Sequence, residues 1–369
     1  MYTLFFNFYP INNISILDIY LFYYVIIHIG HFKNVEKPIL FTILVLLSSF
    51  LVAGVFSIQE SYFGVSQYLL NSLRILFYCV VYFIVSETTK KGNFTLIKNL
   101  RASLTVLLFL VVVEQVIQFL GVYWSYTIPG ITTNTGSKFA PFRPSGTFDE
   151  PSYLAVYLGL VYFILQEANV ADKYWRLLIF ILLVLSRSLT GFLILPVLML
   201  IEFRKYGFWR RRLPLFVILG GLLIIIGSSL LGERILGALS DASLTHRLAG
   251  SWEVFSYLWN EKFWTGLGLG QWLNWLNEEG ESSESFFFMK GYSRGSGINN
   301  VLLMNYGSAG VIGLFATIYF GLRVNRGLKF QSILLWIYFS WGYFFHPMIF
   351  LFFGIINGLK ELNSRHNRT

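Results

Sequence analysis

Long apolar runs separated by polar connections make up most of this chain of 369 residues. A helix crosses a bilayer core with about 20 consecutive apolar residues, and shorter runs cross when the bilayer thins locally. The pattern therefore predicts an all-α fold, a polytopic membrane bundle of about eleven transmembrane helices that forms one domain over residues 1–369. The expected spans lie at about 14–29, 38–56, 66–86, 102–121, 151–166, 175–189, 191–203, 214–231, 299–321, 331–345 and 347–359.

The composition excludes several classes of protein. Charged residues make up 13% of the chain, whereas soluble domains carry about 25%, so no separate soluble domain is expected. The single cysteine, Cys79, rules out a disulfide framework and a cysteine-based metal site. The five histidines show no metal-ligand spacing. The glycine-rich phosphate-binding loop of nucleotide hydrolases is missing as well.

The net charge of +9 would suit a nucleic-acid-binding protein, but its distribution indicates a membrane topology instead. When the loops between the spans are taken alternately, one set holds nineteen basic residues and the other eight, with Arg74 inside a span as the last of the 28. Basic loops stay in the cytoplasm, so the larger set is cytoplasmic and the N-terminus lies outside. The outer set is Lys138, Arg143, Arg187, Arg234, Arg247, Lys262, Lys290 and Arg294.

Two outer connections are long, at about 122–150 and 232–298, and long loops usually carry function. The first ends in an arginine, Arg143, and two carboxylates, Asp149 and Glu150, just before Pro151 opens a span. Polar groups there must face a cavity, because they are costly in hydrocarbon. Glu150 is the better candidate for a catalytic general base and Asp149 the second. The alternative is that Glu150 only stabilises the N-terminus of the helix through its charge.

Four outer arginines lie at span ends on the same side: Arg143, Arg187, Arg247 and Arg294. A guanidinium group binds phosphate through two hydrogen bonds and stays charged, so the set predicts a pyrophosphate-binding site at the outer membrane face. The alternative is that each arginine pairs with a loop carboxylate or a lipid headgroup. Supporting polar residues are Ser186, Thr190, His246, Asn299 and Asn300.

Within the spans, Arg74 and Glu114 are expected at similar depths below the outer face. They are interpreted first as a structural ion pair, and Arg74 is also a candidate for binding the substrate phosphate. The aromatic stretch 252–264 predicts an amphipathic helix in the membrane interface, which either lines a groove for lipid tails or only anchors the loop. Gly266, Gly268 and Gly270 predict a turn that permits close approach of backbones.

Four stretches in this order resemble the O-antigen polymerase and ligase superfamily, which includes the Wzy-type polymerases. They are RPSGTFDEPSYLA at 143–155, LSRSLTG at 185–191, the segment from Arg247 to Gly270, and NNVLLMNYGSAGVIGL at 299–314. Ligases of the superfamily tend to carry a histidine just before the asparagine of the fourth stretch. This chain has Gly297 and Ile298 there, which favours a polymerase.

The resemblance implies a glycosyltransferase of the bacterial inner membrane that works at its periplasmic face. The expected partners are an undecaprenyl-pyrophosphate-linked oligosaccharide and membrane lipid, with a chain-length regulator left open and no nucleic acid. No cofactor or metal is expected, because the transfer requires neither. Two alternatives remain open: an O-antigen ligase, and a transporter of polysaccharide or lipid-linked oligosaccharide. Charges are few inside the spans, which disfavours the transporter.

Overall fold

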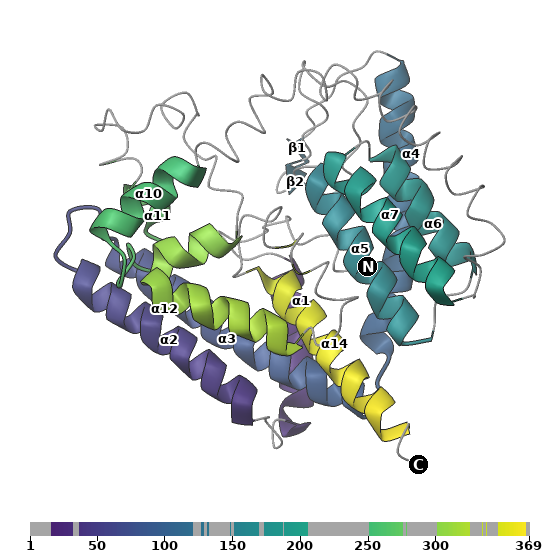
Figure 1. Ribbon diagram of the computed structural model, residues 1–369. Helices are drawn as coiled ribbons and strands as arrows, with labels where there is room; N and C mark the ends of the chain where they lie inside the picture. Colours follow the sequence, from purple (N-terminus) through teal and green to yellow (C-terminus); the bar gives the residue numbers. More distant parts are fainter. Residues whose placement is uncertain are drawn as a thin grey trace. The chain divides into compact units, whose positions relative to one another are not determined.

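The computed structural model describes most of the apolar runs as helices (Figure 1). The residues that it describes are 16–31, 37–120, 127–128, 131–132, 148, 151–169, 173–186, 188–205, 251–275, 278, 301–324, 334, 337 and 346–366.

Helices dominate the part of the chain that the structure describes. They are α1 (Ile16–His28), the short 3-10 helix η2 (Ile29–His31), α2 (Lys37–Ser57), α3 (Val65–Lys90), α4 (Thr95–Phe119), α5 (Pro151–Glu167), α6 (Lys173–Leu185), α7 (Leu189–Lys205), α10 (Ser251–Glu261), α11 (Trp272–Trp275), α12 (Val301–Val324) and α14 (Pro347–His366). The strands β1 (Thr127–Ile128) and β2 (Ile131–Thr132) pair antiparallel, with Thr127 opposite Thr132. Nine of the expected runs are thus helices, and their ends agree to within a few residues except that α4 begins seven residues earlier and α14 ends seven residues later than expected. The run 214–231 lies outside the described residues, and 331–345 is described only at Leu334 and Ile337.

Four of the described helices are long and apolar enough to cross a membrane. Their apolar segments are Leu40–Ser57, Val65–Lys90, Thr95–Ile117 and Val301–Val324. Large hydrophobic side chains such as Phe41, Val55 and Phe56 of α2 are exposed on the protein surface. Exposed apolar side chains on a long apolar helix suit contact with lipid. The chain is therefore a helical membrane protein.

The helices fall into two compact units, which are described separately. Unit 1 comprises residues 1–28, 88–237 and 358–369, and unit 2 comprises residues 29–87 and 238–357. The helices α3 and α14 each contribute residues to both units. The prediction of one membrane domain over the whole chain stays a prediction.

In unit 1, α5 packs against α4, α6 and α7. Its residues 154–166 are all buried, as expected of a helix that is apolar on every side. Two contacts fix the N-terminal half of α5. The hydroxyls of Tyr157 and Ser103 of α4 share a hydrogen bond of 2.7 Å, and the ring of Phe148 lies 5.1 Å from that of Tyr157. Phe148 belongs to the first predicted functional stretch, so this stretch packs against the buried helix α5 of unit 1.

Polar contacts gather near the ends of α3 and α14 in unit 1. Lys90 forms an ion pair with Glu361, and the side-chain amide of Asn363 donates to the carbonyl oxygen of Glu167 at 3.2 Å. Burial lowers the pKa of Lys360 to about 8, and the charge of Glu167 opposes part of that shift. These contacts join the end of α5, the end of α3 and the C-terminal helix.

A glycine terminates α3. Gly92 has a positive φ of 83°, the N–H of Asn93 donates to the carbonyl of Thr88, and the N–H of Gly92 donates to that of Thr89. This pair of bonds is a Schellman motif, in which a glycine in the left-handed region satisfies the last carbonyls of a helix. The motif explains why the helix stops at Lys90, within a polar stretch.

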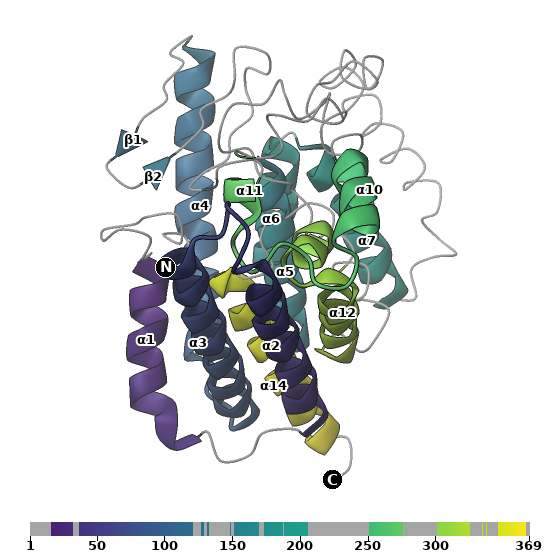
Figure 2. The same cartoon turned by 90° about the vertical axis from the view of Figure 1, so that its left-hand side faces the viewer.

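Unit 2 is built on α2, which packs along α12 and also contacts α3 (Figure 2). A Cβ atom on Gly54 of α2 would overlap the ring of Tyr68 of α3, whose hydroxyl donates to the carbonyl of Phe50 at 3.0 Å. Small residues at helix interfaces let helices in membranes approach closely. On the other side of α12, the ring of Phe320 packs 5.8 Å from that of Phe353 of α14.

Candidate functional site

In unit 1, the turn between α6 and α7 packs against the start of α5. The hydroxyl of Ser186 donates to the carbonyl of Leu183 at 2.8 Å and is buried with it. A Cβ atom on Gly191 would lie 3.0 Å from that hydroxyl oxygen and 3.5 Å from the Cβ of Ala155. An added Cβ would crowd the hydroxyl of Ser186 and the carbonyl of Leu183 within the turn, and its contact with Ala155 of α5 would be of ordinary van der Waals length. Two of the four predicted stretches, 143–155 and 185–191, are thus neighbours in the fold.

Buried polar side chains surround this turn. Ser186, Ser188 and Thr190 are buried, as is Ser152 in the first turn of α5. Pro151 begins α5, as predicted for a first helical residue. Arg143, Asp149, Glu150 and Arg187 lie outside the described residues, so their roles as phosphate-binding and catalytic groups stay predictions.

In unit 2, the helix α12 is broken at Ala309 and Gly310. Ala309 has φ −144° and ψ 19°, and Gly310 has φ 62° and ψ −161°. In an intact helix the N–H of Val311 would donate to the carbonyl of Gly307. Here Val311 donates to the carbonyl of Phe263 at 2.9 Å, and Gly307 accepts from the N–H of Leu267 at 2.6 Å. The segment after α10 thus supplies both partners that the break removes.

The glycines of this segment permit the contact. A Cβ atom on Gly266, which has φ +65°, would lie 2.6 Å from the carbonyl oxygen of Gly307 and 2.7 Å from the nitrogen of Gly310. A Cβ atom on Gly310 would overlap the carbonyl of Trp264. Gly270 faces the side chain of Asn71 of α3 in the same way. The prediction that this glycine-rich turn permits close approach of backbones is confirmed, and its partner is the predicted fourth stretch.

We refer to residues 262–271 as the glycine loop. Its contacts with α12 lie six to ten residues from Val301, which is about 9–15 Å along the helix axis. Irregular backbone at membrane depth is tolerated only where protein covers it. Residues 266–269 are all buried, so the glycine loop meets this condition.

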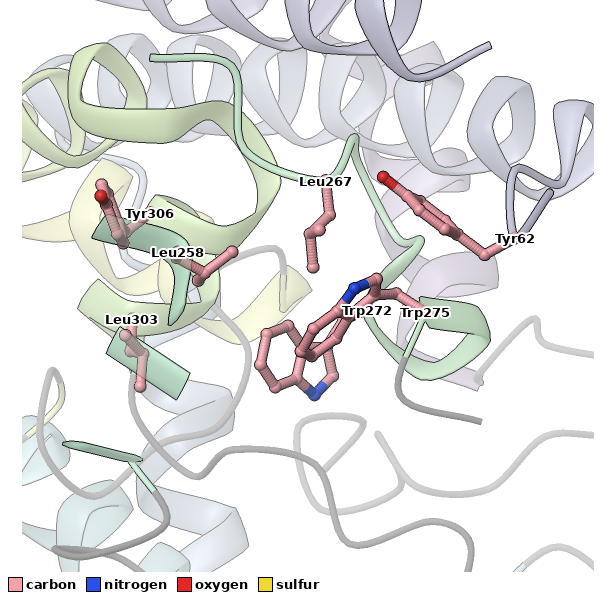
Figure 3. Close-up of a cluster of buried hydrophobic side chains, with 7 residues drawn as sticks. All are labelled: Tyr62, Leu258, Leu267, Trp272, Trp275, Leu303 and Tyr306. Atoms are coloured by element: carbon pink, nitrogen blue, oxygen red, sulfur yellow. The ribbon is translucent and has the colours of Figure 1, made fainter. Parts of the chain in front are cut away.

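An aromatic core covers the glycine loop (Figure 3). Leu267 of the loop lies between the side chains of α10 and α12 on one side and Tyr62 on the other (Figure 3). The ring of Trp272 lies 3.4 Å from where a Cβ of Gly307 would be. The buried members of this core are Tyr62, Leu258, Leu267, Trp272, Trp275, Leu303 and Tyr306.

Amide side chains clamp the glycine loop to the connection between α2 and α3. The buried Gln271 accepts from the N–H of Gly64 at 2.8 Å and donates to the carbonyl of Gly64 at 3.1 Å. Gln67 of α3 donates to the carbonyl of Gly270 at 3.0 Å, and Asn274 of α11 donates to Gln271 at 3.1 Å. An ion pair of 2.5 Å between Lys262 and Glu60 closes the same face. Sequence reasoning missed this clamp, because no spacing links residues about 200 positions apart.

Replacing Gln271 by alanine will lower the free energy of unfolding by about 2–4 kcal/mol. The change leaves the N–H and carbonyl of Gly64 without their partner, and each unsatisfied buried group costs about 1–3 kcal/mol. The midpoint of denaturation of the purified protein in detergent measures the effect. Lys262→Met is the control, because a partly exposed ion pair contributes at most about 1 kcal/mol. Equal midpoints for the two variants would contradict the described clamp.

Three buried polar groups beside the break make no hydrogen bond with the described residues. They are the side-chain amide of Asn305, the hydroxyl of Tyr306 and the indole N–H of Trp272. Asn305 and Tyr306 precede the break in α12, and Trp272 follows the glycine loop. Buried polar groups are nearly always satisfied in native proteins, by protein or by water. The break in α12 therefore lies beside several buried polar groups that have no protein partner among the described residues.

The remaining predicted site residues stand as follows. Arg74 lies half-buried on α3 in unit 2, and Glu114 is buried on α4 in unit 1, so their pairing stays a prediction. His246, Arg247, Arg294, Asn299 and Asn300 lie outside the described residues. Among the described residues, no cluster of histidine, cysteine or carboxylate side chains could hold a metal ion.

The fold and the site define a class: a helical membrane protein with a broken span into which a buried loop inserts. No protein-family model matches the chain, and searches of curated proteins and of solved structures return no match either. Its particular activity is therefore argued from its own residues.

Proposed function

We propose that this protein is a polysaccharide polymerase of the bacterial inner membrane, which acts on O-antigen or a related repeat-unit glycan. The observation that carries the proposal is the pairing of the four stretches that resemble the O-antigen polymerase and ligase superfamily. Gly191 of the second stretch approaches Ala155 of the first in unit 1, and Gly266 of the third approaches Gly307 of the fourth in unit 2. In each unit, two of the four stretches thus contact each other, as a shared site would require.

The proposed topology has eleven transmembrane helices, with the long loops 122–150 and 232–298 on the periplasmic side. Two groups of contacts support it. Gln271 bonds to Gly64, and both residues belong to connections assigned to the outer face. Lys90 pairs with Glu361, and both belong to segments assigned to the cytoplasmic face. Each group joins segments that the charge alternation places on one side.

In the proposed reaction, the donor is a growing glycan linked to undecaprenyl pyrophosphate. A hydroxyl oxygen of the sugar on a second lipid-linked repeat unit attacks the anomeric carbon of the donor. The bond from that carbon to the pyrophosphate oxygen breaks, and undecaprenyl pyrophosphate leaves with the electron pair. Glu150 orients the attacking hydroxyl or accepts its proton, with Asp149 as the second candidate.

The arginines carry the larger part of the proposed catalysis. Arg143, Arg187, Arg247 and Arg294 would neutralise the charge that develops on the leaving pyrophosphate, and Arg74 is a further candidate. A pyrophosphate held in this way leaves readily, so positioning of the two sugars can replace a strong base. The scheme requires no nucleotide and no metal.

The experiment that tests the proposal is deletion and restoration of the gene, read from the lipopolysaccharide ladder on a gel. If the protein is a polymerase, the deletion will remove the ladder and leave one repeat unit attached to the core. The restored gene will return the ladder. Loss of every repeat from the core, with free polymer elsewhere, would identify a ligase instead. If the ladder and the capsular polysaccharide are both unchanged, the proposal is wrong.

A further inference from the structure

The helix α10 presents an aromatic flank on the surface of unit 2 that no described part of the protein covers. Trp252 and Trp259, seven residues apart on one face of the helix, are 69% and 52% exposed, and Trp264 just beyond the helix is 68% exposed. The rings form a continuous row. Trp252 and Phe255 lie 5.9 Å apart, and Phe255 and Trp259 lie 5.5 Å apart. Phe263 continues the row at 4.6 Å from Trp259.

Two other sides of α10 have different characters. Leu258 is fully buried in the aromatic core and fixes the helix to α12. Ser256, Asn260 and Glu261 are exposed polar residues. Asn260 lies about 80° around the helix from Trp252 and about 100° from Trp259, and Ser256 lies between Trp252 and Asn260. The helix therefore has a core side, an aromatic flank and a polar flank.

The aromatic flank adjoins an exposed apolar stripe on α12. The hydrogen bond from Val311 to the carbonyl of Phe263 places Trp264 opposite Gly310, two residues before Ile312 on α12. From Ile312 onward, α12 exposes an apolar stripe at the spacing of one helix face. Its members are Ile312, Phe315, Tyr319 and Leu322. Because α12 is long and apolar enough to cross a membrane, this stripe is the side expected to contact lipid.

We propose that α10 lies along the membrane–water interface, with Trp252, Trp259 and Trp264 among the headgroups and upper acyl chains of the bilayer and with Asn260 in water. Tryptophan favours this layer, because its ring is apolar while its N–H can reach a polar partner. A helix with adjacent apolar and polar flanks lies in the plane of the interface. The occupant of the aromatic flank is phospholipid, and the stripe on α12 continues it into the hydrocarbon.

The ion pair and the hydrogen bonds of the clamp also hold α10 in the proposed position at the interface. Lys262 at the end of α10 is tied to Glu60, and Gln271 is tied to Gly64. The helix therefore cannot move deeper into the bilayer without drawing the connection between α2 and α3 with it. Both ends of the glycine loop are fixed at the level of α10, and the loop between them reaches down to the break in α12.

Spin labels will test the position of α10 in vesicles of phosphatidylethanolamine and phosphatidylglycerol. Single cysteines replace Trp259, Asn260 or Phe315 in full-length protein that carries Cys79→Ala, and each receives a nitroxide. Collisions with oxygen report lipid, and collisions with a water-soluble nickel chelate report water. We expect the ratio of oxygen to nickel collisions to be several-fold higher at Trp259→Cys than at Asn260→Cys, and highest at Phe315→Cys.

A ratio at Trp259→Cys as low as that at Asn260→Cys would overturn the proposal. If soluble glycan then lowered nickel collisions at that position, the aromatic flank would be a sugar-binding surface instead. Trp252→Cys gives an independent reading on the same flank should the first variant not fold. The measurement needs no substrate, so its result does not depend on whether the protein is a polymerase.

Discussion

Alanine in place of Gly310 will remove most of the folded protein. The backbone at Gly310, with φ 62° and ψ −161°, lies in a region that only glycine adopts readily, and this alone costs about 1–3 kcal/mol. The added Cβ would also overlap the carbonyl of Trp264, which is backbone and cannot rotate away. The glycine loop must then withdraw, and Gly307 and Val311 lose their partners. Together these effects exceed about 4 kcal/mol, a large share of a typical total stability of about 5–15 kcal/mol.

Gly92→Ala is the matched control. Gly92 also has a positive φ, of 83°, but a Cβ atom there would meet nothing within 4 Å. Its replacement carries only the backbone penalty, about 1–2 kcal/mol. The two variants are compared by the yield of monodisperse protein after extraction and by the midpoint of thermal denaturation in detergent. Similar results for both would show that the loop does not approach Gly310 as described.

The second large effect is expected at Arg187. Alanine at this position will reduce chain elongation in cells by about 10²–10³-fold, the usual loss when one donor to a developing anion is removed. In sequence Arg187 stands between Ser186 and Ser188, which are both buried, and Gly191 after them lies in contact range of Ala155 of α5. The change removes charge at the proposed pyrophosphate site and leaves the buried hydroxyls in place. The length distribution of polysaccharide in the complemented deletion strain measures the effect.

Two further variants separate charge from folding at Arg187. Arg187→Lys keeps one positive charge but loses the fork that holds two phosphate oxygens, so elongation should stay well below normal. Arg323→Ala removes an arginine from the last turn of α12, at the end assigned to the cytoplasm, and should leave the ladder normal. All variants are checked for equal amounts in the membrane. Normal long chains with Arg187→Ala would refute the role of Arg187 in binding pyrophosphate.

Much of the secondary structure could be read from the sequence. A long apolar run in a membrane protein has to form a helix, since its backbone groups find no other partners in lipid. For this reason α2, α3 and α5 lie within a few residues of their predicted ranges. The glycine-rich turn was predicted for a similar local reason, because three glycines at alternate positions have few structural uses besides backbone freedom. Boundaries shifted where caps intervene, as at Gly92, which ends α3.

The site was less accessible to sequence reasoning. Nothing in the composition of 299–321 distinguishes a broken helix from a continuous one, because glycines such as Gly307 and Gly310 are common in straight membrane helices. The clamp by Gln271 was missed because an isolated polar amide in a loop carries no signal of its partner. Both features depend on contacts between segments that are far apart in the chain.

The sequence by itself thus determined that the protein is helical and membrane-embedded, and where most of its helices run, because hydrophobic pattern and backbone satisfaction act locally. Only the tertiary structure decided that α12 opens at Ala309 and Gly310. A break in a membrane helix leaves an N–H and a carbonyl without partners, which is too costly in lipid unless another segment supplies them. The carbonyl of Phe263 and the N–H of Leu267 do so here. These two partners become available only when the glycine loop folds against α12.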